Sequence, residues 1–188
     1  MKSLTLTQPW ATLVAIGAKR IETRSWSTSY RGPLAIHAAT GYGKGGAKAH
    51  KALCATEPFC SVLNAACKAH YDALNTSGGV LRAMAESPFM PMGAIVATCD
   101  LVAVLRTENT PIGVRGETAI IDSDMEYRVI TMTDYEVAFG DYTPGRYAWI
   151  LANSKPLATP IPAKGALSLW EPDTLTALAL KRQEVEND

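Results

Sequence analysis

The sequence has no apolar run long enough to cross a membrane and no segment typical of a secretory signal. Its longest uncharged apolar stretches, such as residues 93–99, are far shorter than the ~20 residues that a membrane helix needs. Residues 1–5 lack a long apolar core and a small-residue cleavage site. We therefore expect a cytoplasmic protein that does not enter a membrane. The four cysteines could pair arithmetically, but we expect reduced thiols rather than a disulfide framework.

Familiar phosphate-binding and repeat signatures are also missing. The glycine-rich segment 41–46 contains one lysine, but it does not end in the Gly-Lys-Ser/Thr of a P-loop. We interpret this segment as a loop or hinge. The chain shows no internal repeat. Because the phosphate-binding signature is missing, we expect no cofactor.

The composition is that of a globular chain, and its neutral total hides an asymmetry in charge. Of the 188 residues, 47% are hydrophobic and 19% are charged, which excludes wholesale disorder. Residues 1–70 hold nine Lys/Arg and two acids, whereas residues 71–188 hold nine Lys/Arg and sixteen acids. A basic first half could supply a surface for phosphates. Alternatively, the two halves simply neutralise each other in the fold.

The order of the elements predicts the fold class. Period-two alternation and turn residues indicate strands near residues 2–6, 20–26, 34–39, 94–105, 118–121, 127–131 and 146–151. Helices are expected at 10–16 with Thr7 as its cap, within 47–86 with breaks at 57–58 and 78–79, after a cap at Thr133 or Asp134, and at 175–180. A turn is expected at 122–124 between two of the strands. This order predicts an α+β protein: a mixed β-barrel with flanking helices and a helical insertion at about 42–90. We expect one domain over 1–172, then a C-terminal helix and a frayed tail over 173–188.

The densest group of charged residues lies where the first helix leads into the second strand. On a strand, Arg20, Glu22 and Arg24 project to one face, and Lys19 lies at the junction. A carboxylate between two guanidinium groups stays ionised and fixes both. Such a group could bind a phosphate or the polar edge of a base. The alternative is a solvent-exposed edge strand whose charges contribute little.

Aromatic residues accompany this segment. Trp10 and Trp26 lie near it, and Tyr147 and Trp149 lie in the late strand. Aromatic rings beside cations can form a platform for unpaired bases. The alternative is that some of these tryptophans belong to the core, as we expect for His37 on its apolar strand.

Further chemistry is possible at two places. Glu136 or Asp141 could add a second carboxylate, although we interpret Glu136 as a surface residue of a capped helix. Within the insertion, two helix-spaced pairs could close a tetrahedral zinc site. They are His50 with Cys54, and Cys67 with His70. Because cysteines are common in buried helix faces, we expect no metal.

Five segments together resemble a known family. They are QPWA at 8–11, GAKRIETRSW at 17–26, RGPLAIHA at 31–38, FGDY at 139–142 and GRYAWIL at 145–151. The first three resemble the opening of an ASCH domain, a family named for its homology to a human transcriptional coactivator, and the last two resemble its closing strand. The resemblance covers the first forty residues and roughly 93–170, and it leaves the insertion unplaced.

The resemblance implies a PUA-like β-barrel, a fold associated with RNA, with a basic, aromatic-lined cleft where the early helix meets the barrel. The implied ligand is single-stranded RNA or a nucleoside or nucleotide. The expected polar wall consists of Lys19, Glu22 and Arg24; the stacking candidates are Trp10, Trp26 and Tyr147; Arg146 is a backbone or phosphate contact. Replacing Lys19 or Arg24 with Ala is expected to weaken RNA binding and leave the melting temperature nearly unchanged.

Two other functions stay open. One branch of the family hydrolyses the amide of acylated cytidines with a lysine and a threonine nucleophile, and another member resembles a metal-dependent ribonuclease. Here Glu22 stands at the threonine's position, and Thr23 is expected on the opposite face of the strand. If the protein is an enzyme, Lys19 and Glu22 would be its catalytic residues, although neighbouring arginines favour Glu22 as a ligand-positioning group. Alternatively, the insertion would make the chain a protein-interaction module.

Overall fold

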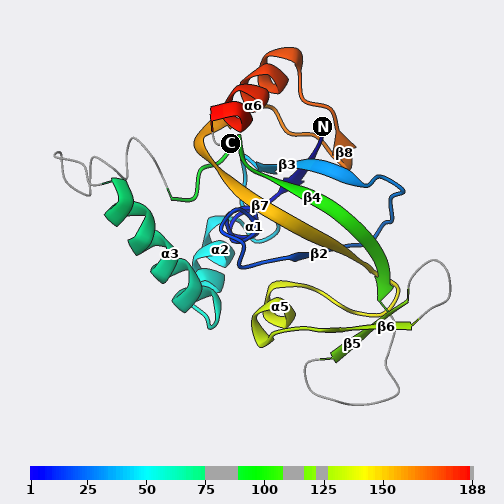
Figure 1. Ribbon diagram of the computed structural model, residues 1–188. Coiled ribbons are helices and arrows are strands. Elements are labelled where there is room, and N and C mark those ends of the chain that lie inside the picture. Colours follow the sequence, from blue (N-terminus) through cyan, green and yellow to red (C-terminus); the bar gives the residue numbers. More distant parts are fainter. Residues whose placement is uncertain (75–88, 108–116, 122–126, 187–188) are drawn as a thin grey trace.

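The computed structural model in Figure 1 describes residues 1–74, 89–107, 117–121 and 127–186. Its elements are β1 (Lys2–Leu6), α1 (Trp10–Ala15), β2 (Ile21–Arg24), β3 (Gly32–Ala38), α2 (Gly46–Cys54), α3 (Phe59–Leu74), β4 (Ala94–Thr107), β5 (Glu117–Ile121), β6 (Tyr127–Thr131), α5 (Asp134–Phe139), β7 (Tyr147–Pro162), β8 (Leu169–Trp170) and α6 (Thr174–Glu186). The α+β class is as predicted.

One curled sheet forms the frame of the fold. The strands follow the order β2-β7-β4-β3-β1-β8, and β5 extends from β4 to pair with β6. The β1–β3 pair is parallel and the other pairs are antiparallel, so the sheet is mixed. Across its open side, Arg24 Nη2 on β2 donates to Thr5 O on β1 at 2.9 Å. The result is a PUA-like half-barrel whose edge strands are β2 and β8. Because β8 pairs only with Ser3 and Leu4, the end of β1 faces β2 across the open side.

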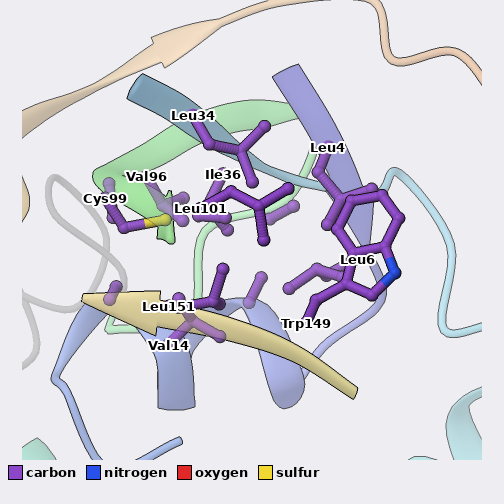
Figure 2. Packing of buried hydrophobic residues seen from close by; sticks show 14 of the residues in the cluster. Leu4, Leu6, Val14, Leu34, Ile36, Val96, Cys99, Leu101, Trp149 and Leu151 are labelled. Atoms are coloured by element: carbon purple, nitrogen blue, oxygen red, sulfur yellow. The ribbon is translucent and has the colours of Figure 1, made fainter. Parts of the chain in front are cut away.

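The main core lies inside the curve of this sheet and is closed by α1. Figure 2 shows Val14 of α1 together with Leu151 and Trp149 of β7, facing Leu34 and Leu101 of β3 and β4. Residues 11–15 of α1 are all buried, as expected for a helix in which Thr12 is the one polar residue. Each fully buried Leu or Val side chain contributes about 1.5–3 kcal/mol of hydrophobic stabilisation.

The start of α1 differs from the prediction. Pro9 is the N-cap, and no side chain caps it there, so Thr7 is not the cap residue. Instead the side chain of the buried Gln8 points toward the first turn of α1, where its Oε1 accepts from Thr12 N at 3.2 Å. Its Nε2 donates to Pro91 O at 2.8 Å. Gln8 therefore anchors α1 to the segment that enters β4.

The second half of the chain contains two longer elements than predicted. β7 continues through Pro156 and Pro160 to Pro162, and its pairing with β4 is interrupted by three register shifts. Prolines restrict the backbone to extended conformations and are tolerated in strands beside such irregularities. α6 runs to Glu186, so residues 184–186 are helical rather than a frayed tail. The expected breaks at 78–79 and 122–124 lie outside the described residues.

The predicted insertion forms two helices that pack on the half-barrel. α2 and α3 meet at a break around residues 55–58, as expected. Phe59 and Leu63 of α3 are buried against Leu13 of α1 and Phe139 of α5, and Figure 1 places α2 beside α1. The insertion therefore shares a core with the rest of the chain. In the ranges described above, no helix combines the length and apolar character that crossing a bilayer requires.

Candidate functional site

A cleft of about 400 Å³ opens at the gap between β1 and β2. Its walls come from the end of β1, the start of α1, β2, the end of α5 and the two insertion helices. The lining residues are Thr5, Leu6, Thr7, Trp10, Glu22, Thr23, Arg24, Leu53, Phe59, Ala138, Phe139, Gly140 and Asp141. A volume of this size suits a small ligand or a single nucleobase.

Glu22 is the fixed carboxylate of the cleft. Its Oε1 lies 3.1 Å from Arg24 Nε, and its Oε2 lies 3.6 Å from Lys19 Nζ. Only 11% of the Glu22 side chain is exposed. The period of the strand places Glu22 and Arg24 on one face of β2, and the hydrogen bond to Thr5 O holds the guanidinium. The pair therefore presents a hydrogen-bond acceptor beside a donor.

Lys19 lies behind the cleft rather than on its wall. Gly17, with φ of +74°, lets the chain turn back after α1, and Lys19 N then donates to Leu13 O at 3.0 Å. The Lys19 side chain is fully buried, and its Nζ donates to Ile21 O and to Phe139 O, the latter at 2.9 Å. Burial lowers the pKa of Lys19, opposed by the charge of Glu22. Lys19 thus holds Glu22 from behind.

Arg20 and Glu136 differ from their predicted places. The Arg20 side chain is 66% exposed, and its Nε lies 3.8 Å from Glu136 Oε1 instead of joining Glu22. Glu136 is buried, not a surface residue: it accepts from Arg20 N and, at 3.3 Å, from Ile21 N. Burial raises its pKa. Thr133 caps α5 as predicted, and α5 thereby brings a carboxylate to the unpaired N–H groups of edge strand β2.

Of the predicted stacking residues, Trp10 lines the cleft and the other two do not. Trp10 Nε1 donates to Phe139 O at 3.0 Å, and its ring meets Phe59 edge-on at 6.2 Å. Trp26 instead packs edge-on against the buried Trp149 at 4.7 Å, and Tyr147 packs on the same core cluster. Tyr147 and Trp149 share the core because alternate residues of β7 face the inside of the barrel, and Trp26 packs onto them from the segment after β2.

Two aromatic lining residues were not predicted. Phe139 begins the FGDY motif, which was noted for its resemblance but not for its ring. Phe59 comes from the insertion, and no local pattern distinguishes it from the other apolar residues of α3. Only the packing of α3 against α1 brings the Phe59 ring to the cleft.

Arg146 supports the cleft without lining it. Its Nε donates to Asp141 O at 3.0 Å and lies 3.4 Å from Asp141 Oδ2. Its Nη2 donates to Thr23 O at 3.4 Å, and Thr23 Oγ1 accepts from Asp141 N at 3.0 Å. Arg146 therefore ties the loop carrying Asp141 to β2. The hydrogen bonds that Asp141 accepts from the Thr143 backbone and hydroxyl lower the pKa of Asp141.

The charge of the lining differs from the basic cleft that the sequence predicts. Two carboxylates, Glu22 and Asp141, face it together with one guanidinium, Arg24. The buried Lys19 offsets Glu22 but is not reached from the cleft. Such a lining accepts hydrogen bonds from N–H groups and repels an anion. A polar base edge fits it better than a phosphate.

The four candidate zinc ligands do not assemble. Cys54 Sγ lies 3.7 Å from His50 Nε2 on α2, whereas His70 on α3 packs against Tyr71 and Phe89. Among the described residues, no three His, Cys, Asp or Glu side chains are arranged to share a metal ion.

Comparison with protein-family models gives a match. The model of the ASCH domain family matches residues 4–161, a range that contains the half-barrel strands β2, β3 and β4, the cleft and the insertion helices. No curated protein matches the sequence. Because the family model covers most of the chain and the half-barrel is consistent with it, the protein belongs to the ASCH domain family.

Proposed function

We propose that this ASCH domain binds RNA or a nucleoside by seating one base in the cleft between β1 and β2. The observation that carries the proposal is the Glu22–Arg24 pair, fixed at 3.1 Å in a cleft of about 400 Å³. Membership of a family with a PUA-like, RNA-associated fold supports it. Unpaired RNA bases are recognised by hydrogen bonds to their edges and by stacking on aromatic rings.

The chemistry of the lining suggests which part of the ligand enters. Glu22 can accept from an amino or imino N–H of a base, and Arg24 can donate to a neighbouring carbonyl or ring nitrogen. Trp10 offers the aromatic face, because its indole N–H is already used on Phe139 O. The carboxylates of Glu22 and Asp141 repel a phosphate inside the cleft. The sugar and phosphate of the ligand therefore stay outside the cleft.

The buried position of Lys19 favours binding over hydrolysis. A catalytic lysine must reach the reacting atoms, but the Lys19 ammonium is buried and donates to two backbone carbonyls. Thr23, the threonine that follows Glu22 in the sequence, uses its Oγ1 to accept from Asp141 N. We therefore assign Lys19 a positioning role toward Glu22. The hydrolase alternative predicts turnover of acylated cytidines, which product analysis at high protein concentration would reveal.

Calorimetry with nucleosides and a short single-stranded RNA tests the proposal. We expect Glu22→Gln and Arg24→Gln each to weaken binding about tenfold, equivalent to about 1.4 kcal/mol, because each removes one side of the base-edge contact. Glu171→Gln is the matched control, since Glu171 pairs with Lys2 on the surface away from the cleft lining. Thermal melts of each variant establish that it is folded. Wild-type protein that binds neither RNA nor any nucleoside would contradict the proposal.

A further inference from the structure

Helix α2 stands directly against one wall of the cleft. Leu53 of α2 is a lining residue. A ring nitrogen of His50 lies 3.1 Å from Gln8 O, and the loop before α2 approaches Thr7 so closely that a Cβ on Gly43 would lie 3.1 Å from Thr7 Cγ2. Thr7 is itself part of the lining. The outer surface of α2 therefore continues from the edge of the cleft.

This outer surface is uniformly basic. Lys48 and Lys51 are exposed and three residues apart, which places them on one side of the helix, and the exposed Lys44 lies in the loop just before it. His50 and Leu53 project from the other side, toward the cleft wall. No acidic residue occurs between Glu22 and Glu57.

Lys44, Lys48 and Lys51 also differ from several other cations of the chain in their surroundings. Lys2 pairs with Glu171, Lys68 with Asp72 and Arg146 with Asp141. Over the described ranges, no carboxylate lies within ion-pair distance of Lys44, Lys48 or Lys51. Their positive charge is therefore available to an anionic partner.

We propose that α2 is a phosphate-contacting surface for an RNA strand that has one base in the cleft. The inference rests on the proposed function and narrows it, from RNA or a nucleoside to an RNA strand several nucleotides long. Because the cleft lining carries two carboxylates, the phosphates must be neutralised elsewhere, and α2 provides the adjoining cations. Neighbouring side chains three residues apart on a helix have Cβ atoms about 5–6 Å apart, which suits successive phosphates of an extended strand.

The test compares two double variants that remove equal charge. Lys48→Gln/Lys51→Gln removes cations from α2, and Lys155→Gln/Lys181→Gln removes exposed cations from β7 and α6. Binding of an RNA of about eight nucleotides is measured by fluorescence anisotropy between about 50 and 200 mM salt. Binding of the corresponding nucleoside is measured by calorimetry. Each lost phosphate contact lowers the salt slope of a single strand by about 0.7, so we expect the α2 variant to lose about 1.4.

We expect the α2 variant to bind the RNA about tenfold more weakly at low salt, with nucleoside affinity unchanged, and the control variant to match wild type. Equal RNA affinity for the α2 and control variants would overturn the inference and leave the cleft function standing. Wild-type protein that binds the nucleoside but gains nothing from the longer RNA would also overturn it. Failure of the wild type to bind either ligand would remove the proposed function together with the inference.

Discussion

Replacing Lys19 with Met tests whether the charged group behind the cleft is a buried ion pair. The substitution keeps the length of the side chain and removes an ammonium group that is fully buried. Removing one partner of a buried ion pair costs about 3–5 kcal/mol. In Lys19→Met, Glu22 would still have Arg24 as a partner at 3.1 Å, and Phe139 O would still accept from the Trp10 indole at 3.0 Å. We therefore expect the lower end, about 3 kcal/mol.

For a chain of this size, about 1 kcal/mol shifts the melting temperature by about 2–4 °C, so Lys19→Met should melt about 6–12 °C below wild type. Thermal and urea denaturation followed by circular dichroism measure the difference. Arg20→Met is the control, because its exposed ion pair is worth less than about 1 kcal/mol. If Lys19→Met has the same melting temperature as Arg20→Met, the buried Lys19 ammonium does not stabilise the fold. The sequence-based expectation of an unchanged melting temperature would then be right.

Three further predictions concern other parts of the half-barrel. Gly140→Ala should destabilise the protein by about 1–3 kcal/mol in urea denaturation, because the new Cβ would lie 2.5 Å from the Tyr142 ring; unchanged stability would show that the ring moves freely. Burial lowers the pKa of His37 below 6.5, so the neutral imidazole contributes stability above pH 6.5, and this stability is lost as the pH falls through the folded pKa. The urea midpoint should therefore decrease between about pH 7.5 and about pH 5.5 more in wild type than in His37→Gln. An equal decrease in the two proteins would contradict this. Burial raises the pKa of Cys99 to about 12, so its thiol should resist Ellman's reagent near pH 8 until urea is added, and Cys99→Ser should lower the thiol count in urea by one while leaving the native count unchanged.

Much of the fold follows from local patterns in the sequence. Period-two alternation and apolar runs bounded by turns predict β1, β3 and β4 within a few residues, because these strands bury apolar side chains in the common core. Thr133 predicts the start of α5, because a threonine hydroxyl satisfies a backbone N–H of the first turn. The order of strands, helices and strands likewise predicts the α+β class. Each of these signals depends on residues close together in the chain.

The site is less predictable from the sequence, because the burial and orientation of its side chains depend on segments that are distant in the chain. Arg20 and Arg24 look equivalent on a strand, yet α5 brings Glu136 to Arg20 from 116 residues away. The sequence predicts Lys19 as a cation on the cleft wall, whereas in the fold its ammonium is buried and donates to Phe139 O. The insertion gives no hint that Phe59 reaches the cleft.

By itself, the sequence determines the segments that become strands and helices and the short charged segment that supplies Glu22 and Arg24, because hydrophobic period and strand geometry act over a few residues. Only the tertiary structure decides which charges are buried, which rings line the cleft and which lysines stay exposed beside it. Those properties depend on surface removed by packing, and the segments that remove it are separated by up to about two thirds of the chain.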